Sequence, residues 1–306
     1  MPHGFSSSKG NRMRAVLVAV AVVAVVAGCT SRSDRPPPRG APTMSVTEAE
    51  APPETGSDDE PEESQDPDND PVPDIDESAY VGGGFAGVGA GGLGTIGYGW
   101  ADDSGAAIGH LTVDHLVRDT STPDAVESDH VDFQETPNFP VPPNPRVPVL
   151  KTTGNADVAL IGPVDAKLAP VVELTDGTKL IATDYADAGE IKVGQRVCHS
   201  GQNEVTATMH EVCGLVVSVG ATSNCTPKNG SSTCVVSVKS ERTDGYPGDH
   251  GDSGAAAYTY NPNGTITIVG TYKSANTGTG TGDFEPTYAA MEAFGGHPFT
   301  TRDLAG

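Results

Sequence analysis

Beyond residue 79, the hydrophobic positions fall in short runs of four to eight residues, each bounded by turn-forming residues. Runs of this length that are rich in Val, Ile and Thr are typical of β-strands. They cover residues 106–113, 158–161, 171–174, 179–183, 215–219, 235–238 and 266–272. Asp176-Gly177 and Asn263-Gly264 each separate two such runs, as the turns of β-hairpins do. The pattern therefore predicts an all-β domain over residues 79–306.

One stretch near the C-terminus has a helical pattern instead. Residues 286–294 begin at Pro286 and are followed by Gly295 and Gly296, which are the positions that proline and glycine prefer around a helix. We expect a short helix there. The glycine-rich run 82–94 leaves two interpretations open: a strand with close backbone packing, or a mobile linker.

The first segment of the chain is typical of an export signal. Lys9, Arg12 and Arg14 precede an apolar run over residues 15–28, which is shorter than the roughly 20 residues of a spanning helix. The run ends in Val-Ala-Gly-Cys at residues 26–29, which resembles a bacterial lipoprotein signal. We expect a signal peptide over 1–28, acylation (palmitate) of Cys29, and a lipid anchor on the extracytoplasmic face of the cell membrane. An ordinary secretory signal with release to the extracellular space is the alternative.

Residues 29–78 have the composition of a disordered tether. The stretch 30–78 holds 15 acidic and 3 basic residues, many prolines and almost no large apolar side chains. Such a segment cannot bury enough surface to offset the entropy of ordering it. The whole chain has a net charge of −23. This acidity argues against nucleic acid as a partner.

Candidate chemistry lies in the tetrapeptide Gly-Asp-Ser-Gly at 251–254. A serine between glycines can expose its hydroxyl at a tight turn, while the NH groups of Gly251 and Ser253 can receive a developing oxyanion. Such a serine needs a base and a group that orients the base. His115 and His110 compete for the first role, and Asp157, just before an apolar run, suits the second.

These motifs resemble the chymotrypsin-fold serine proteases, within them the bacterial streptogrisin and alpha-lytic protease group. Residues 251–254 match the family's GDSG, and 157–160 match its D-x-A-L. Residues 111–116 are similar to its L-T-A-G-H-C with Leu, Thr and His kept, which favours His115 over His110 as the base. The resemblance covers residues 85–294. It implies two six-stranded antiparallel β-barrels and a short C-terminal helix, with the active site between the barrels and a boundary near Gly189.

The resemblance also bears on the cysteines. With Cys29 assigned to lipid, four remain, and four cysteines allow three pairings. The family implies a disulfide between Cys198 and Cys213, which leaves Cys225 to pair with Cys234. A metal site is a weak alternative because the spacing C-x-x-C does not occur, and we expect no metal and no cofactor.

In this family, the strand after the nucleophile forms one wall of the pocket for the residue that precedes the scissile bond. The matching residues here include Tyr272 and Lys273, with Pro247 at the pocket base and the nearby Asp249 as the alternative. We expect Lys273 to point to solvent, with pairing to an acidic substrate side chain as the alternative. We therefore expect weak cleavage after Lys or Arg, and a preference for a small apolar or an acidic residue before the scissile bond.

The function expected from these residues is that of an exported, lipid-anchored, monomeric serine endopeptidase with a triad of His115, Asp157 and Ser253. Two departures from the family support an alternative. Asp114 and Ala255 stand where the family has glycine. The alternative is a non-catalytic, protease-like envelope protein that binds a protein or peptide partner.

Overall fold

The structure is a computed structural model that describes residues 80–84, 86–119, 126–134, 146–162, 167–203, 209–228 and 231–305. All of them lie within one compact unit, residues 61–306. The predicted signal peptide, Cys29 and the predicted tether lie outside the described residues. Within the described part of the chain, no helix has both the length and the apolar character needed to cross a membrane.

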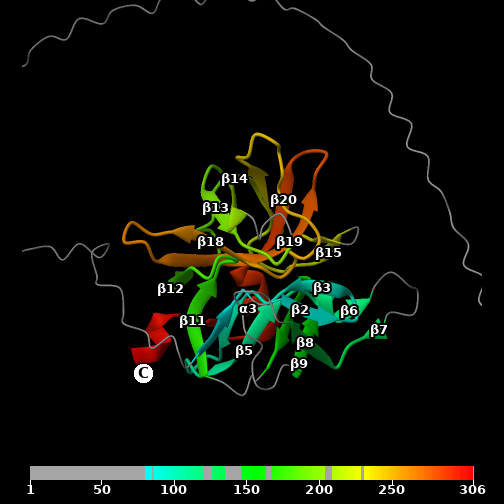
Figure 1. Ribbon diagram of the computed structural model, residues 1–306, viewed down its shortest axis with the longest axis vertical. Coiled ribbons are helices and arrows are strands. Elements are labelled where there is room, and N and C mark those ends of the chain that lie inside the picture. Colours follow the sequence, from blue (N-terminus) through cyan, green and yellow to red (C-terminus); the bar gives the residue numbers. More distant parts are fainter. Residues whose placement is uncertain are drawn as a thin grey trace, which may run out of the picture. The chain divides into compact units, whose positions relative to one another are not determined.

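Seven strands of the N-terminal half and one strand from the end of the chain form an eight-stranded antiparallel sheet (Figure 1). Its order is β21-β4-β5-β10-β9-β8-β2-β3. The bounds are β2 (Ala86–Gly89), β3 (Gly92–Thr95), β4 (Tyr98–Ala101), β5 (Ala107–Thr112), β8 (His130–Gln134), β9 (Arg146–Thr153), β10 (Val158–Ile161) and β21 (His297–Pro298).

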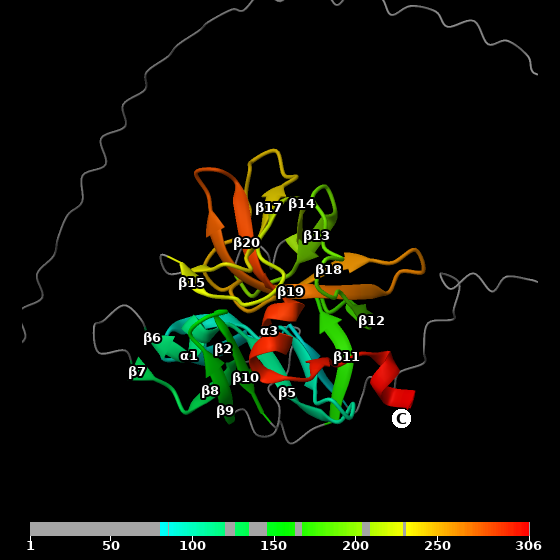
Figure 2. The same cartoon turned by 180° about the vertical axis from the view of Figure 1, so that it is seen from behind.

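The other large sheet has nine strands in the order β1-β11-β12-β19-β18-β13-β14-β17-β20. An additional pairing of β19 with β20 closes six of them into an antiparallel barrel. In Figures 1 and 2 this barrel lies on one side of the N-terminal sheet. The bounds are β1 (Tyr80–Gly83), β11 (Lys167–Glu173), β12 (Lys179–Tyr185), β13 (Arg196–His199), β14 (Val212–Val219), β17 (Val236–Ser240), β18 (Ala256–Tyr260), β19 (Ile266–Asn276) and β20 (Thr281–Pro286).

The prediction of an all-β fold with a short C-terminal helix is confirmed. Of the two six-stranded barrels that were expected, the C-terminal one is closed, and the strands of the other form the eight-stranded sheet. Two pairings depart from a purely antiparallel arrangement, because β1 runs parallel to β11 and β12 runs parallel to β19. The smaller elements are α1 (Asp114–Val117), β6 (Arg118–Asp119), β7 (Val126–Glu127), β15 (Pro227–Lys228), β16 (Ser231–Ser232), α3 (Thr287–Phe294) and a 3-10 helix, η3 (Thr301–Ala305). The boundary near Gly189 stays a prediction.

The predicted turns and helix end are confirmed as well. Gly177 and Gly264 have φ of 86° and 84°, the left-handed region that glycine enters without strain, and each lies in the turn of an antiparallel hairpin. Helix α3 follows Pro286 and ends at Gly295, which has φ of 72° and whose NH donates to Met291 O.

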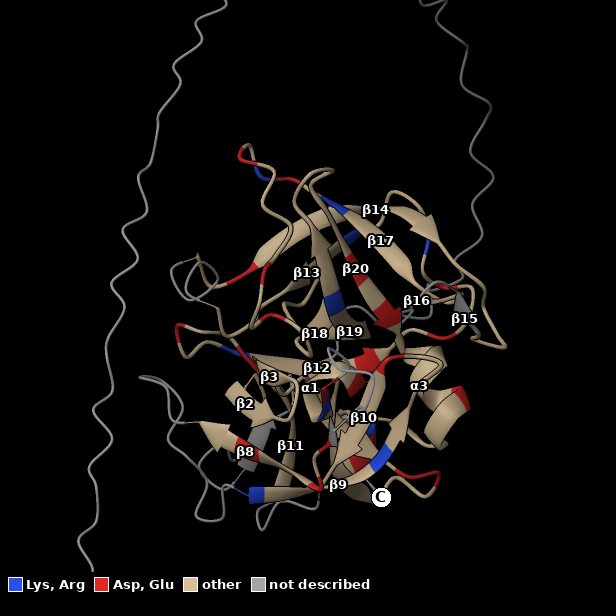
Figure 3. Cartoon of the chain, turned by 90° about the vertical axis from the view of Figure 1, so that its right-hand side faces the viewer, with Lys and Arg blue, Asp and Glu red and all other residues tan. Residues whose placement is uncertain are grey.

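The main hydrophobic core joins the two sheets. It contains Tyr98 and Leu111 from the N-terminal sheet and Tyr258, Ile268 and Phe284 from the barrel, all nearly fully buried. Burial of large apolar side chains contributes about 1.5–3 kcal/mol each, so this shared core is what holds the two sheets together. Acidic and basic residues are scattered along strands and turns of both sheets (Figure 3).

The glycine-rich run is a tightly packed hairpin, β2 and β3, and so the linker interpretation is wrong for its described residues. A Cβ on Gly91 would overlap the carbonyl oxygen of His115, and one on Gly94 would lie 2.8 Å from Ser253 O. Side chains at these positions would push the hairpin off its neighbours. The glycines therefore let this hairpin contact both the α1 segment and the tetrapeptide loop.

Gly91→Ala tests this packing. Because the new methyl group would overlap backbone atoms, we expect the free energy of unfolding to fall by about 1–3 kcal/mol or more. Gly154→Ala is the matched control, since a Cβ there meets nothing within 4 Å. It should change stability by less than about 0.5 kcal/mol in the same urea titration. Equal stability of both variants would contradict the close packing.

Candidate functional site

His115 and Asp157 lie at the same end of the N-terminal sheet. Strands β5 and β10 are antiparallel neighbours, with Thr112 opposite Ala159, so the end of β5 meets the start of β10. Helix α1 begins just after β5 and carries His115, while Asp157 immediately precedes β10. Asp157 has φ of 38°, a left-handed conformation that Asp tolerates better than most residues.

The two side chains are held together by three contacts. The backbone NH of His115 donates to Asp157 Oδ1 at 3.0 Å. His115 Nδ1 lies 3.0 Å from Oδ2 and 3.2 Å from Oδ1 of the same carboxylate. An ionised carboxylate only accepts hydrogen bonds, so Nδ1 carries the proton and Nε2 presents its lone pair. This is the tautomer that a general base requires.

Asp157 is charged in this setting. Burial opposes its ionisation, but the hydrogen bonds and charge of His115, together with the charge of Lys273, outweigh that effect and lower the pKa of Asp157. Next to it, burial raises the pKa of Asp114 to about 6, although Arg118, 3.5 Å away, works in the opposite direction. The Asp157 carboxylate that faces His115 Nδ1 is therefore ionised at neutral pH, and Asp114, whose pKa lies closer to neutrality, loses its charge first as the pH falls.

His110 occupies a different environment. It lies within β5, is fully buried, and its ring packs edge-on against Phe133 with the ring centroids 6.3 Å apart. The side chain of His115 is 37% exposed by comparison. A base that serves a substrate needs access to it, and of these two residues His115 has that access.

The loop that carries Ser253 is docked on the glycine-rich hairpin. Gly251 and Gly254 have φ of 99° and 95°. Thr95 donates from its NH to Ser253 O at 2.7 Å and from its hydroxyl to Gly251 O at 2.6 Å. The carbonyl oxygens of the loop are therefore turned toward the hairpin. Within the described residues, the NH groups of Gly251 and Ser253 donate to no protein group, so both are available to a ligand.

The Ser253 hydroxyl donates to the carbonyl oxygen of Lys273 at 2.9 Å. In the described part of the chain no hydrogen bond joins it to His115. To leave the Lys273 carbonyl oxygen, the Ser253 hydroxyl has to rotate about the Cα–Cβ bond. Such a rotation is a change between ordinary rotamers. The preceding residue, Asp252, is fully buried, accepts a hydrogen bond from Asp249 N and lies 3.6 Å from His199 Nε2, in keeping with a role in setting the turn.

The expectation that Lys273 points to solvent is wrong. Its side chain is 10% exposed, and Nζ lies 3.0 Å from Glu285 Oε1 and 3.6 Å from Asp157 Oδ2. Glu285 is itself buried and accepts a hydrogen bond from Ser232 Oγ at 2.7 Å. Burial raises the pKa of Glu285, and its contacts with Lys273 and Ser232 oppose that rise. Two buried carboxylates draw the ammonium inward because each would be costly to bury without a partner.

Tyr272 points to the other side of the strand and fills the space between two backbone segments. Its hydroxyl donates to Pro247 O at 2.8 Å, and its ring stacks on His199 with the centroids 3.9 Å apart. A Cβ on Gly282 would lie 2.8 Å from the Tyr272 ring. The cavity beside the ring has a volume of about 20 Å³, which is room for about one water molecule.

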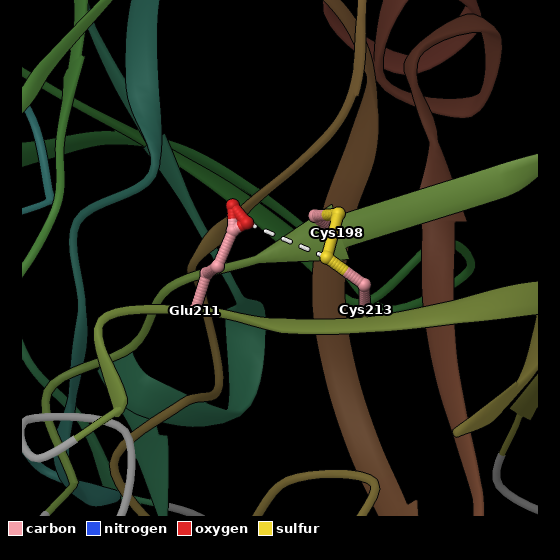
Figure 4. A group of neighbouring side chains, drawn as sticks. All are labelled: Cys198, Glu211 and Cys213. Carbon is pink, nitrogen blue, oxygen red and sulfur yellow. Dashed lines mark hydrogen bonds between the residues drawn. A yellow bond between two sulfur atoms is a disulfide. The ribbon is translucent and has the colours of Figure 1, made fainter. Parts of the chain in front are cut away.

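Both expected disulfides are present, Cys198–Cys213 and Cys225–Cys234. The carboxylate of Glu211 lies beside the first of them, with Oε2 3.4 Å from Cys213 Sγ (Figure 4). Two cysteines and a carboxylate within 4.8 Å resemble a metal site. Metals bind thiolates, however, and these sulfurs are bonded to each other. Glu211 instead accepts hydrogen bonds from the tyrosine hydroxyl of Tyr260 at 2.7 Å.

Sequence reasoning missed two contributors to the site. Thr95 comes directly after the glycine-rich run. Its hydroxyl contacts Gly251, 156 residues away, and nothing in the local sequence indicates this contact. Glu285 lies between Phe284 and Pro286, two residues after Asp283. Two acids this close together give no local sign of which one is buried, so the sequence carries no signal for the pairing of Glu285 with Lys273.

Comparisons with known proteins agree with this architecture. No protein-family model matches the sequence, and no curated protein matches it by sequence. Among solved structures, protease A from Thermobifida fusca is similar over 72% of this chain and 100% of its own, with 18% identity and a TM-score of 0.50. A glutamic acid-specific serine protease described as using a histidine triad in substrate binding matches 71% of this chain and 100% of its own, also with 18% identity and a TM-score of 0.50.

Chymotrypsin from Cellulomonas bogoriensis matches 72% of this chain and 98% of its own, with 18% identity and a TM-score of 0.48. At 18% sequence identity, a structural likeness establishes the fold and no finer property. The resemblance first drawn from the short motifs at 111–116, 157–160 and 251–254 is confirmed at that level. The chain has the fold of the chymotrypsin-like bacterial serine proteases.

Proposed function

We propose that the protein is a serine endopeptidase in which Ser253 is the nucleophile, His115 the general base and Asp157 the carboxylate that orients His115. The observation that carries the proposal is the pair of contacts between His115 Nδ1 and the ionised Asp157, which leaves Nε2 as an acceptor. Ser253 lies in the same site, because its hydroxyl is bonded to the backbone of Lys273, whose side chain reaches Asp157.

The chemistry follows from these roles. Ser253 Oγ, once rotated toward His115, attacks the peptide carbonyl while His115 Nε2 takes its proton, and the imidazolium then gives that proton to the leaving amine. Water repeats the sequence on the acyl-enzyme and releases the acid. The NH groups of Gly251 and Ser253, which donate to no group among the described residues, receive the oxyanion, and each is worth roughly 3 kcal/mol of transition-state stabilisation.

A fluorophosphonate probe, which needs an activated serine, tests the proposal directly. The protein should react with it, and Ser253→Ala and His115→Ala should each reduce the rate of labelling by about a thousandfold or more. Ser104→Ala and His210→Ala are matched controls, since both residues are exposed and Ser104 has the similar context Asp-Ser-Gly-Ala-Ala. Labelling of the controls should be unchanged.

The second candidate function is a protease-like protein that binds a peptide or protein without cleaving it. It is favoured by the Ser253 hydroxyl, which is bonded to Lys273 O, and by Tyr272, which occupies the pocket region. A folded protein that resists the probe while it binds peptides would decide for this function and against the peptidase.

For the substrate, we propose that the residue before the scissile bond is small, such as Gly or Ala. The support is steric: the Tyr272 ring fills the space between Pro247 and Gly282, and room for about one water molecule remains. A long cationic side chain has no space there. One similar structure is a glutamic acid-specific protease. In this chain His199 is covered by the Tyr272 ring, which argues for a small residue over an acidic one.

A peptide-library cleavage profile tests the pocket. The wild type should cleave after Gly and Ala, and Tyr272→Ala should shift the preference by at least tenfold toward larger apolar residues, because it removes the ring that fills the space. Tyr260→Ala, on the exposed end of β18, is the matched control and should leave the profile as it is. A wild-type profile dominated by Lys or Arg would refute the assignment of the pocket.

We also propose that the mature protein is a monomer held to the outer face of the membrane by lipid on Cys29, with residues 30–78 as the spacer. The support is the sequence alone: the small residues before Cys29 and the acidic, proline-rich composition behind it. Two or more acyl chains anchor a protein far more firmly than one. The net charge of −23 makes nucleic acid an unfavourable partner.

Cys29→Ala should abolish incorporation of labelled palmitate and move the protein from the membrane fraction to the soluble fraction. The double variant Cys225→Ala/Cys234→Ala is the matched cysteine control, because these two cysteines are bonded to each other, offer no thiol for acylation, and leave none when both are replaced. Its palmitate incorporation should equal that of the wild type. Retention of the Cys29→Ala protein in the membrane fraction would point to a different anchor.

A further inference from the structure

The ammonium of Lys273 lies next to the carboxylate that orients His115. Lys273 Nζ is 3.6 Å from Asp157 Oδ2, and the same oxygen is 3.0 Å from His115 Nδ1. The cation is thus separated from the imidazole by no more than the sum of these two distances. Its side chain is 10% exposed, so water screens the charge poorly. A cation at this place should oppose formation of the imidazolium that catalysis requires.

Glu285 supplies the opposite charge on the far side of Lys273. Its Oε1 lies 3.0 Å from Nζ, and Ser232 donates to its Oε2 at 2.7 Å. The strands explain the arrangement, because β19 and β20 are antiparallel neighbours with Thr271 opposite Glu285. Asp157, Lys273 and Glu285 together carry one negative charge when both acids are ionised, which equals the charge of an isolated orienting aspartate.

We propose that Lys273 and Glu285 are positioning residues that act through Asp157: Lys273 fixes the carboxylate that holds His115, and Glu285 cancels the charge of Lys273 so that Asp157 still stabilises the imidazolium. The inference rests on the proposed triad. Neither residue touches the reacting atoms with its side chain. Their roles are separable, because removal of Glu285 leaves an uncompensated cation and removal of both leaves Asp157 alone.

Three other charged residues face the same site, and none of them is replaced in the variants described below. Asp114 is the first residue of α1, and Arg118 follows the helix. Glu127 on β7 lies 3.8 Å from Arg118. Burial, opposed by Arg118, raises the pKa of Asp114 to about 6. Because all variants keep these three groups, differences between variants report the charges of Lys273 and Glu285.

The first measurement does not depend on catalysis. In the Ser253→Ala background, the titration of the His115 imidazole is followed by NMR. Glu285→Gln should lower its midpoint by about one pH unit or more, since an uncompensated charge now lies within a few ångströms. Lys273→Met added to Glu285→Gln should bring the midpoint back to within about 0.3 units of the starting protein.

Lys273→Met alone should raise the midpoint, because it removes the ammonium that lies beside the Asp157 carboxylate. This variant keeps the test decisive even if Glu285→Gln does not fold. Lys239→Met is the matched control, since Lys239 is exposed on the neighbouring strand β17 and should have no effect. A midpoint unchanged in Glu285→Gln, or lowered in Lys273→Met, would overturn the proposal.

The second measurement is the pH profile of fluorophosphonate labelling with Ser253 intact. At neutral pH, Glu285→Gln should label at least tenfold more slowly than the wild type, and the double variant should recover most of that loss. If the two residues only supported the fold, their losses would add and the double variant would be the slowest. A wild type that resists the probe while the NMR shifts occur would refute the peptidase and leave the charge arrangement standing.

Discussion

The site depends on the close approach of the glycine-rich hairpin to the loop that carries Ser253. Thr95 bonds to the carbonyl oxygens of Ser253 and Gly251, and these contacts require two backbones to come within hydrogen-bond distance. A Cβ at Gly94 would lie 2.8 Å from Ser253 O, so any residue with a side chain would hold the segments apart. The same hairpin reaches the α1 segment through Gly91. One element with little side-chain volume thereby fixes His115 and Ser253 relative to each other.

Charge burial is the second constraint on the site. Asp157, Lys273 and Glu285 are each largely removed from water, and a single buried charge of this kind costs several kcal/mol. Together they satisfy one another, with Ser232 and the His115 NH as further donors. Such a network tolerates the joint loss of Lys273 and Glu285 better than the loss of Lys273 alone, since Glu285 would then stay buried without an opposite charge. This asymmetry is what makes its members experimentally separable.

Local signals predicted much of this protein, and distant contacts account for the rest. The turns at Gly177 and Gly264 and the end of α3 at Gly295 depend on left-handed glycines within a few residues, so the sequence reveals them. The motifs around His115 and Asp157 are also local. The direction of Lys273 was predicted wrongly because it depends on Glu285 from the next strand and on Asp157 from the other sheet. The glycine-rich run was ambiguous for the same reason, since what it packs against is distant in sequence.

Tyr272 and Lys273 show how one strand can serve two purposes. Successive side chains of a strand point to opposite faces, so Tyr272 lies against Pro247 and His199 while Lys273 turns toward the carboxylates. The Lys273 carbonyl oxygen also accepts the Ser253 hydroxyl. A shift of β19 by one residue would exchange the two faces, placing an ammonium in the pocket and a phenol beside Asp157. The register of β19 against β20 therefore sets both the shape of the pocket beside Tyr272 and the charge around His115.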